Sequence, residues 1–133
     1  MAETATNRGP GRLLIAVYLL FAIAASARAG VQIATKLAEA PVAYLLSGVA
    51  AVIYIVAAVG LARAGTGGRR TALVCCLVEF FGVLGVGTLS LVEPHLFPEA
   101  TVWSEFGSGY GYIPLVLPVL GLAWLWHSRP TPP

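Results

Sequence analysis

The sequence predicts an all-α membrane protein, a four-transmembrane-helix antiparallel bundle, and three observations support this fold class. Apolar residues make up 58% and charged residues 11% of the 133 residues, with a mean hydropathy of +0.84, against roughly 45–50% and about 25% in soluble domains. Four segments are each about as long as the roughly 20 apolar residues that cross a bilayer as a helix. Basic residues gather in the connections on one side of these segments. The composition therefore excludes a soluble globule, a disordered chain and, because the two cysteines are adjacent, a disulfide-stabilised secreted domain.

The four segments are rich in Ala, Leu and Val and lack the alternation of barrel strands, so each is expected to form a helix. They cover about 13–35, 41–62, 71–92 and 109–126 and belong to a single membrane domain. Pro41 closes one short connection and a glycine-rich stretch over 64–68 forms another, which predicts antiparallel neighbours. The longer connection, 93–108, is expected to be an outer loop, and the ends, 1–8 and 130–133, are expected to be disordered.

The distribution of Lys and Arg predicts the orientation of the chain. One side of the membrane receives most of the basic residues, namely Arg8, Arg12, Arg63, Arg69, Arg70 and Arg129, whereas the other receives only Lys36. Because basic residues stay on the cytoplasmic side, both termini are predicted to be cytoplasmic. Aromatic residues at both boundaries agree with this, with Trp103, Phe106, Tyr110 and Tyr112 at the outer rim and Trp124 and Trp126 at the inner rim.

A rival interpretation concerns the first segment. Arg8 and Arg12, the apolar run 13–27 and the Ala-Arg-Ala triplet at 27–29 also fit a secretory signal with a cleavage site. The helical pattern continues beyond that triplet through Gln32 and Thr35, which favours a membrane span. The intact mass of the purified protein distinguishes the two.

Two charged residues stand inside the apolar segments, where insertion costs about 2.5–3.5 kcal/mol at a helix centre. From the segment midpoints, Arg28 lies about 6 Å to the outer side and Glu79 about 4 Å to the inner side. Helical spacing gives three segments a small or polar face each: Phe21, Ala24, Arg28, Gln32 and Thr35 on the first, Ser47, Ala51, Tyr54 and Ala58 on the second, and Ala72, Cys75, Glu79, Gly82 and Ser90 on the third. We expect these faces to converge on an intramembrane polar cluster whose members satisfy one another: Arg28, Gln32, Ser47, Tyr54 and Glu79.

Two roles fit such a cluster. It holds helices together, or it forms a proton or substrate site. A carboxyl group surrounded by apolar residues favours its protonated form, which suits a proton-coupled carrier, whereas a nearby Arg28 favours the charged form of Glu79.

The remaining motifs give weaker evidence about function. Pro114 and Pro118 lie one turn apart in the fourth segment and are expected to kink it. The Gly-Tyr-Gly triplet at 109–111 matches potassium-channel filters, but the preceding Thr-Val is absent and 93–108 leaves little room for a pore helix. No pattern for an enzyme, a metal, a cofactor or nucleic acid stands out, so we expect a protein that is not an enzyme and binds none of these.

The stretch Val-Trp-Ser-Glu-Phe-Gly-Ser-Gly-Tyr-Gly-Tyr-Ile-Pro-Leu-Val-Leu-Pro at 102–118, with four short spans and seven Arg to one Lys, resembles small four-helix integral membrane proteins of actinobacteria that have no assigned function. The resemblance implies a bacterial cytoplasmic (inner) membrane and supplies no activity and no site residues. The chain also has the size of small multidrug carriers, but their essential Glu lies in the first span, whereas Glu79 lies in the third.

These observations lead to two functional expectations. The first is an accessory or assembly subunit that lies in the lipid bilayer and packs against a membrane-protein partner or a second copy of itself. The alternative is a small proton-coupled transporter that uses an intramembrane site at Glu79 and Arg28. A carrier needs a hydrated path to Glu79, whereas an assembly subunit needs a surface for its partner.

Overall fold

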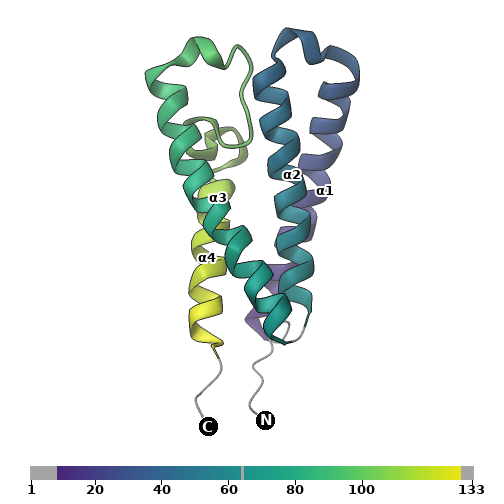
Figure 1. The fold of residues 1–133 in the computed structure, drawn as a ribbon, viewed down its shortest axis with the longest axis vertical. Coiled ribbons are helices and arrows are strands. Elements are labelled where there is room, and N and C mark those ends of the chain that lie inside the picture. Colours follow the sequence, from purple (N-terminus) through teal and green to yellow (C-terminus); the bar gives the residue numbers. More distant parts are fainter. Residues whose placement is uncertain (1–8, 64, 130–133) are drawn as a thin grey trace.

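The computed structural model describes residues 9–63 and 65–129, and every regular element in these two ranges is a helix (Figure 1). Four α-helices are formed: α1 (Pro10–Lys36), α2 (Pro41–Ala62), α3 (Thr66–Val92) and α4 (Ile113–His127). Three short 3₁₀ helices join them: η1 (Leu37–Glu39), η2 (Pro94–Leu96) and η3 (Ser104–Tyr110). The ends predicted to be disordered, 1–8 and 130–133, lie outside the described residues.

Proline and glycine set the positions of the helix starts. α1 and α2 each begin with a proline, where the missing N–H would have no helical partner. α3 begins at Thr66, earlier than the predicted 71, and therefore includes part of the glycine-rich stretch that we expected to be a turn. The reason is close helix packing: a Cβ on Gly68 would lie 2.7 Å from the Arg63 carbonyl oxygen, and one on Gly60 would lie 2.9 Å from the Ala72 nitrogen.

In the part of the chain that the structure describes, three helical segments are long and apolar enough to cross a membrane: α1 continued through η1, α2, and α3. Only 33%, 44% and 33% of their most apolar windows are buried, so most of their apolar surface faces outward. A soluble protein rarely exposes such continuous apolar surface, whereas a bilayer covers it. The prediction of an all-helical chain whose helices are long and apolar enough to cross a membrane is confirmed for the described residues.

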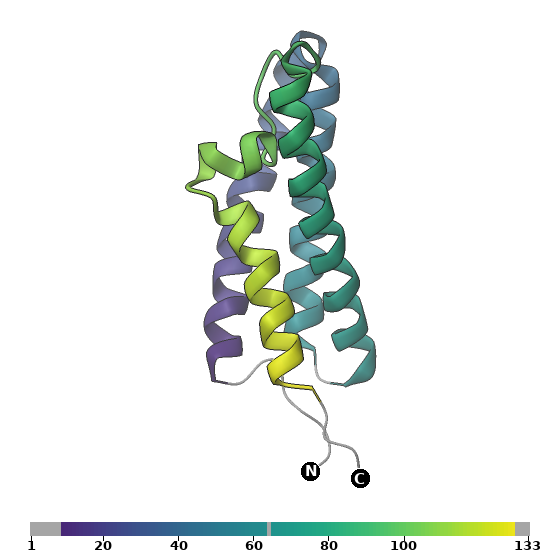
Figure 2. The same ribbon diagram turned by 90° about the vertical axis from the view of Figure 1, so that its left-hand side faces the viewer.

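The fourth predicted span differs from the observed helix. α4 has 15 residues, about 22 Å at 1.5 Å per residue, which is less than the roughly 30 Å of a hydrocarbon core. η3 precedes it at a bend of 100°, so the pair is a broken span or a re-entrant loop in place of the unbroken helix expected over 109–126 (Figure 2).

The helices pack in the order of the chain. α1 lies against α2, α2 against α3, and α3 against α4, whereas α1 and α4 make few contacts (Figure 1). The connection between α3 and α4 does not stay at the end of the helices: η3 packs extensively on α3 and also on α4. The core contains many small residues and three fully buried tyrosines, Tyr18, Tyr44 and Tyr54.

Candidate functional site

Glu79 lies at the centre of the packed helices with none of its surface exposed. α3 turns it inward because Ala72, Cys76 and Val83, which share its helix face, are also completely buried. Its Oε1 accepts a hydrogen bond of 2.8 Å from the Tyr18 hydroxyl on α1. Its Oε2 is buried and has no hydrogen-bond partner among the described residues. Glu79 is therefore a buried carboxyl group in which one of the two oxygens has no partner among the described residues.

α4 packs against this site at Gly121. A Cβ on Gly121 would lie 2.5 Å from Cys76 Sγ and 3.3 Å from the Tyr18 hydroxyl oxygen, so no larger residue fits there without movement. The Tyr18 hydroxyl is also 3.5 Å from Cys76 Sγ. Three helices, α1, α3 and α4, thus meet around the carboxyl group of Glu79.

Two hydrogen bonds attach the segment that connects α3 and α4 to helix α2. Trp103 Nε1 donates a 2.8 Å hydrogen bond to the Tyr54 hydroxyl, and the backbone N–H of Val102 donates to Ser47 Oγ at 3.2 Å. The Tyr54 ring lies 6.3 Å from the Tyr18 ring, centroid to centroid. The two pairs are therefore neighbours, and the connection contributes to the interior of the molecule.

The burial of Trp103 corrects its predicted place at the outer rim. Its side chain is only 4% exposed. The physical reason is the absence of side chains at two glycines of α3: a Cβ on Gly82 would lie 2.7 Å from the Trp103 ring, and one on Gly87 would lie 2.5 Å from the Phe106 ring. Each glycine lets one aromatic ring approach the helix backbone.

The structure separates Arg28 from Glu79. Arg28 is exposed, and its guanidinium carbon lies 5.4 Å from the centre of the Tyr110 ring. This corrects the expectation that Arg28 and Glu79 satisfy one another. The buried face of α1 carries Tyr18, Ala22, Ala25, Ala29 and Gln32, and at 100° per residue Arg28, ten residues after Tyr18, points about 80° away from it. Ala24 and Thr35, which we also placed on this face, are exposed.

The other members of the predicted cluster point inward without forming one network. Ser47 and Tyr54 are buried on α2 and hold the connection, as described above. Gln32 is 8% exposed near the far end of α1, and no hydrogen bond joins it to the other members within the described ranges. The structure thus brings Tyr54 and Glu79 into one interior and leaves Arg28 outside it.

The two prolines of the fourth segment have different roles. Pro114 occupies the first turn of α4, where the helix has no use for its N–H, so it begins the helix and does not kink it. It also packs against Gly107, whose added Cβ would lie 2.7 Å from the Pro114 ring. Pro118 lies inside the helix and is fully buried. Only Pro118 therefore fits the expected removal of a helical hydrogen bond.

Sequence reasoning missed three residues of the site: Tyr18, Trp103 and Gly121. Tyr18 carries a signal in the sequence, because it is the one tyrosine in the predominantly apolar segment 13–35. Gly121 interrupts a run of large apolar residues, which is typical of a close helix contact. Trp103 offered no such signal, since a tryptophan between two spans usually marks the membrane interface.

The register between α3 and α4 gives the depth of the connection. The Arg69 guanidinium donates hydrogen bonds to the carbonyl oxygens of Leu125 and Ser128, and Gly121 lies beside Cys76. From Gly121, eight residues lead back to the start of α4, a length of about 12 Å. From Cys76, sixteen residues lead to the end of α3, a length of about 24 Å. The start of α4 therefore lies roughly 12 Å inside the end of α3.

The irregular segment 105–112 leads into α4 at this depth and begins nearer the end of α3, where the Glu105 N–H donates to Ser90 Oγ at 2.8 Å. Glu105, Phe106 and Tyr112 have positive φ angles, 51°, 62° and 62°. The exposed residues of the segment are Glu105, Ser108, Gly109, Gly111 and Tyr112, and together with Arg28 we call them the loop face. The loop face lies on the side of α1 and α4, where Figure 2 shows η3 extending outward from the helices.

No protein family, curated protein or solved structure matches this chain.

Proposed function

We propose that the chain is a four-span antiparallel bundle of a bacterial inner membrane that acts as an accessory or assembly subunit, and that it contacts another membrane protein through the loop face. The observation that carries this proposal is the exposure of Arg28 and of an irregular segment that reaches about 12 Å inside the end of α3. Backbone N–H and C=O groups in contact with hydrocarbon cost several kcal/mol each when they lack partners, so irregular segments at this depth are normally covered by protein or water.

The charge of Arg28 supports the same conclusion. An arginine inside the hydrocarbon core costs about 2.5–3.5 kcal/mol on insertion scales, and its partner within the described residues is the ring of Tyr110. A carboxylate or a backbone carbonyl of a neighbouring protein would stabilise the exposed side of the guanidinium. A second copy of this chain or a different membrane protein fits this requirement.

The positions of the charges support the proposed orientation. α1 begins and α4 ends at the same end of the molecule (Figure 1). Arg12, Arg63, Arg70 and Arg129 are exposed at that end, whereas Lys36 is exposed at the other, with Glu39, Glu93 and Glu99. The excess of arginines favours the cytoplasm for the end that carries both termini.

Photo-crosslinking in intact membranes tests the proposal. A photoreactive amino acid at position 108, in the loop face, is expected to give a protein adduct, because Ser108 is exposed and would lie against the partner. The same amino acid at position 52 is the matched control, since Val52 is 58% exposed on α2 and would face lipid. Lipid adducts at both positions, with no protein adduct at 108, would refute the proposal. The mass of the adduct distinguishes a second copy from another protein.

A second candidate function is a small proton-coupled transporter, and one observation favours it. Glu79 is an intramembrane carboxyl group whose Oε2 has no hydrogen-bond partner among residues 9–63 and 65–129, and such groups commonly mark proton or substrate paths. Because Arg28 does not reach Glu79, this candidate would rely on Glu79 and Tyr18 alone.

Infrared spectroscopy of the reconstituted protein tests the transporter. A carrier opens Glu79 to water during its cycle, so the carboxyl C=O band of Glu79 is expected to shift within seconds of transfer to D₂O. The band is assigned by its loss in Glu79→Gln. A band that resists exchange for hours would show a sealed structural group and would exclude the transporter.

A further inference from the structure

Two opposite charges of the loop face are exposed and do not pair with each other. Arg28 lies on α1 and Glu105 near the start of η3. The Arg28 guanidinium carbon lies 5.4 Å from the centre of the Tyr110 ring, and Tyr110 is five residues beyond Glu105, about 10 Å along η3 at about 2.0 Å per residue. No ion pair in residues 9–63 and 65–129 involves either side chain. Each charge therefore lacks an opposite charge within these ranges.

The two charges lie at similar depths. The Tyr18 hydroxyl contacts Cys76 Sγ, so these two residues mark a common level. Arg28 is ten residues beyond Tyr18, about 15 Å along α1. Ser90, which accepts the N–H of Glu105, is fourteen residues beyond Cys76, about 21 Å along α3. The difference of about 6 Å is no longer than an extended arginine side chain.

Equal depth is a requirement for pairing between copies of one chain. All copies insert into the membrane in the same direction, so a twofold axis between two of them runs along the membrane normal and keeps each residue at its own depth. In such an isologous contact, residue i of one copy meets residue j of the other, and the reverse contact forms as well. An axis that passes between Arg28 and Glu105 therefore joins the arginine of each copy to the glutamate of the other. A different protein would need an acid and a base at matching positions, whereas a second copy carries both.

The surface between the two charges allows close approach. Gly109 follows Glu105 on η3, and it has no positive φ angle. An added Cβ would meet nothing within 4 Å, so neither backbone conformation nor packing within the described residues requires a glycine there. A neighbouring backbone does, because small residues let membrane segments approach closely.

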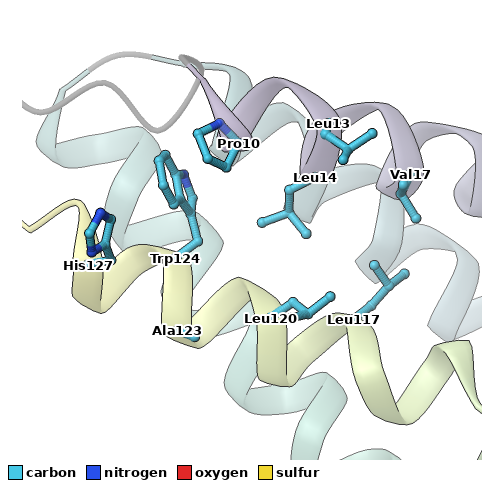
Figure 3. A pocket seen from close by; sticks show the side chains of 9 residues that line it. All are labelled: Pro10, Leu13, Leu14, Val17, Leu117, Leu120, Ala123, Trp124 and His127. Carbon is cyan, nitrogen blue, oxygen red and sulfur yellow. The ribbon is translucent and has the colours of Figure 1, made fainter.

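The surface below the loop face, on the same side of the molecule, carries no charge that would select a partner. α1 and α4 leave a groove there (Figure 3), and its lining in the half nearer the loop face is apolar: Leu14, Val17, Leu117 and Leu120. Recognition on this side of the molecule therefore depends on Arg28 and Glu105.

We propose, as a step that rests on the assembly function above, that the loop face binds a second copy of this chain through two reciprocal ion pairs between Arg28 and Glu105. The Tyr110 ring covers one side of the guanidinium, and the N–H groups at its edge are donors for a carboxylate. Charge-assisted hydrogen bonds of this kind are strong and directional, and they gain further strength where little water is present.

Charge reversal on separate chains tests the pairing. Donor-labelled and acceptor-labelled chains are reconstituted together in vesicles, and energy transfer is measured against protein density. The unmodified chains are expected to form dimers. Arg28→Glu and Glu105→Arg each bring like charges together in their own dimer, so each is expected to raise the dissociation constant about 30-fold or more. A mixture of donor-labelled Arg28→Glu with acceptor-labelled Glu105→Arg restores one native and one reversed pair, and it is expected to recover the energy transfer.

Glu99→Arg is the matched control, because Glu99 is an exposed acid outside the loop face, and it is expected to leave the dimer unchanged. Gel filtration shows that each variant is folded before it is reconstituted. Arg28→Gln and Glu105→Gln replace any reversal that aggregates. Each is expected to weaken the dimer, and the variant with both substitutions is expected to weaken it no more than either alone, because paired residues are not additive.

Three results would overturn the proposal: unmodified chains that stay monomeric, a mixture that associates no better than either reversed chain alone, or losses that add in the double glutamine variant. Monomeric chains together with an adduct to another protein at position 108 would overturn the pairing of copies and leave the assembly function standing. The absence of any protein adduct at 108 refutes the assembly function itself.

Discussion

Tyr18→Phe tests whether the hydrogen bond to Glu79 stabilises the packed helices. The substitution removes one hydroxyl group and keeps the ring, which is completely buried. Because Glu79 Oε2 has no partner in the described residues and Oε1 accepts from Tyr18, the variant leaves a buried carboxyl group without any partner. An unsatisfied buried polar group costs about 1–3 kcal/mol, so the unfolding equilibrium constant is expected to rise about 5- to 150-fold.

The double variant Tyr18→Phe with Glu79→Met makes the test specific. Removing both partners of a buried hydrogen bond is nearly neutral, so the double variant is expected to recover most of the loss seen in Tyr18→Phe. Tyr44→Phe is the matched control: the Tyr44 hydroxyl is buried and has no partner in the described residues, so its removal is expected to leave stability unchanged or to raise it.

The free energy of unfolding is measured by titrating detergent-solubilised protein with sodium dodecyl sulfate and following tryptophan fluorescence. Two results would contradict the reasoning. One is a loss in Tyr18→Phe no larger than in Tyr44→Phe. The other is a double variant whose loss equals the sum of the two single losses, because independent sites add and coupled partners do not.

Two further substitutions test the close contacts around the site. Gly121→Ala is expected to destabilise the protein by about 1–3 kcal/mol through overpacking against Cys76. The control, Gly85→Ala, has open space at its Cβ position and is expected to be neutral or stabilising. The same titration compares the two variants, and equal effects on stability would refute the close contact at Gly121. Trp103→Phe removes the hydrogen-bond donor to the Tyr54 hydroxyl and is expected to lower the free energy of unfolding by about 1–3 kcal/mol. It is also expected to speed proteolysis within 93–103, and an unchanged cleavage rate would contradict this prediction.

The helices and the inward side chains follow from local sequence patterns. Tyr54 continues a stripe of small residues on α2, and Glu79 does the same on α3, so helical spacing places both on buried faces. The second segment begins and ends at the residues that the apolar run predicts, because Pro41 fixes its start. These features depend on residues within one helix, which a sequence displays directly.

Contacts between different helices could not be predicted from the sequence. The spacing on the first segment allowed a face through Arg28 or one through Tyr18, about 80° apart, and only the packing of Ala22, Ala25 and Ala29 against neighbouring helices chose the second. The same limit applies to the start of α3. Gly68 joins the helix because it packs closely against α2, although a glycine-rich stretch by itself favours a turn.

The re-entrant connection and the short fourth helix have a common cause. Trp103 and Phe106 cover Gly82 and Gly87 on α3, so the half of α3 toward Val92 is already covered where the chain turns into α4. A full-length fourth helix would need the same surface, and it would also have to displace the indole N–H from Tyr54. α4 therefore begins only below the two rings, where Gly121 can approach Cys76. The polar segment 105–112 is consequently left exposed beside the helices and reaches roughly 12 Å inside the end of α3, which is the physical reason to expect a protein neighbour on that face.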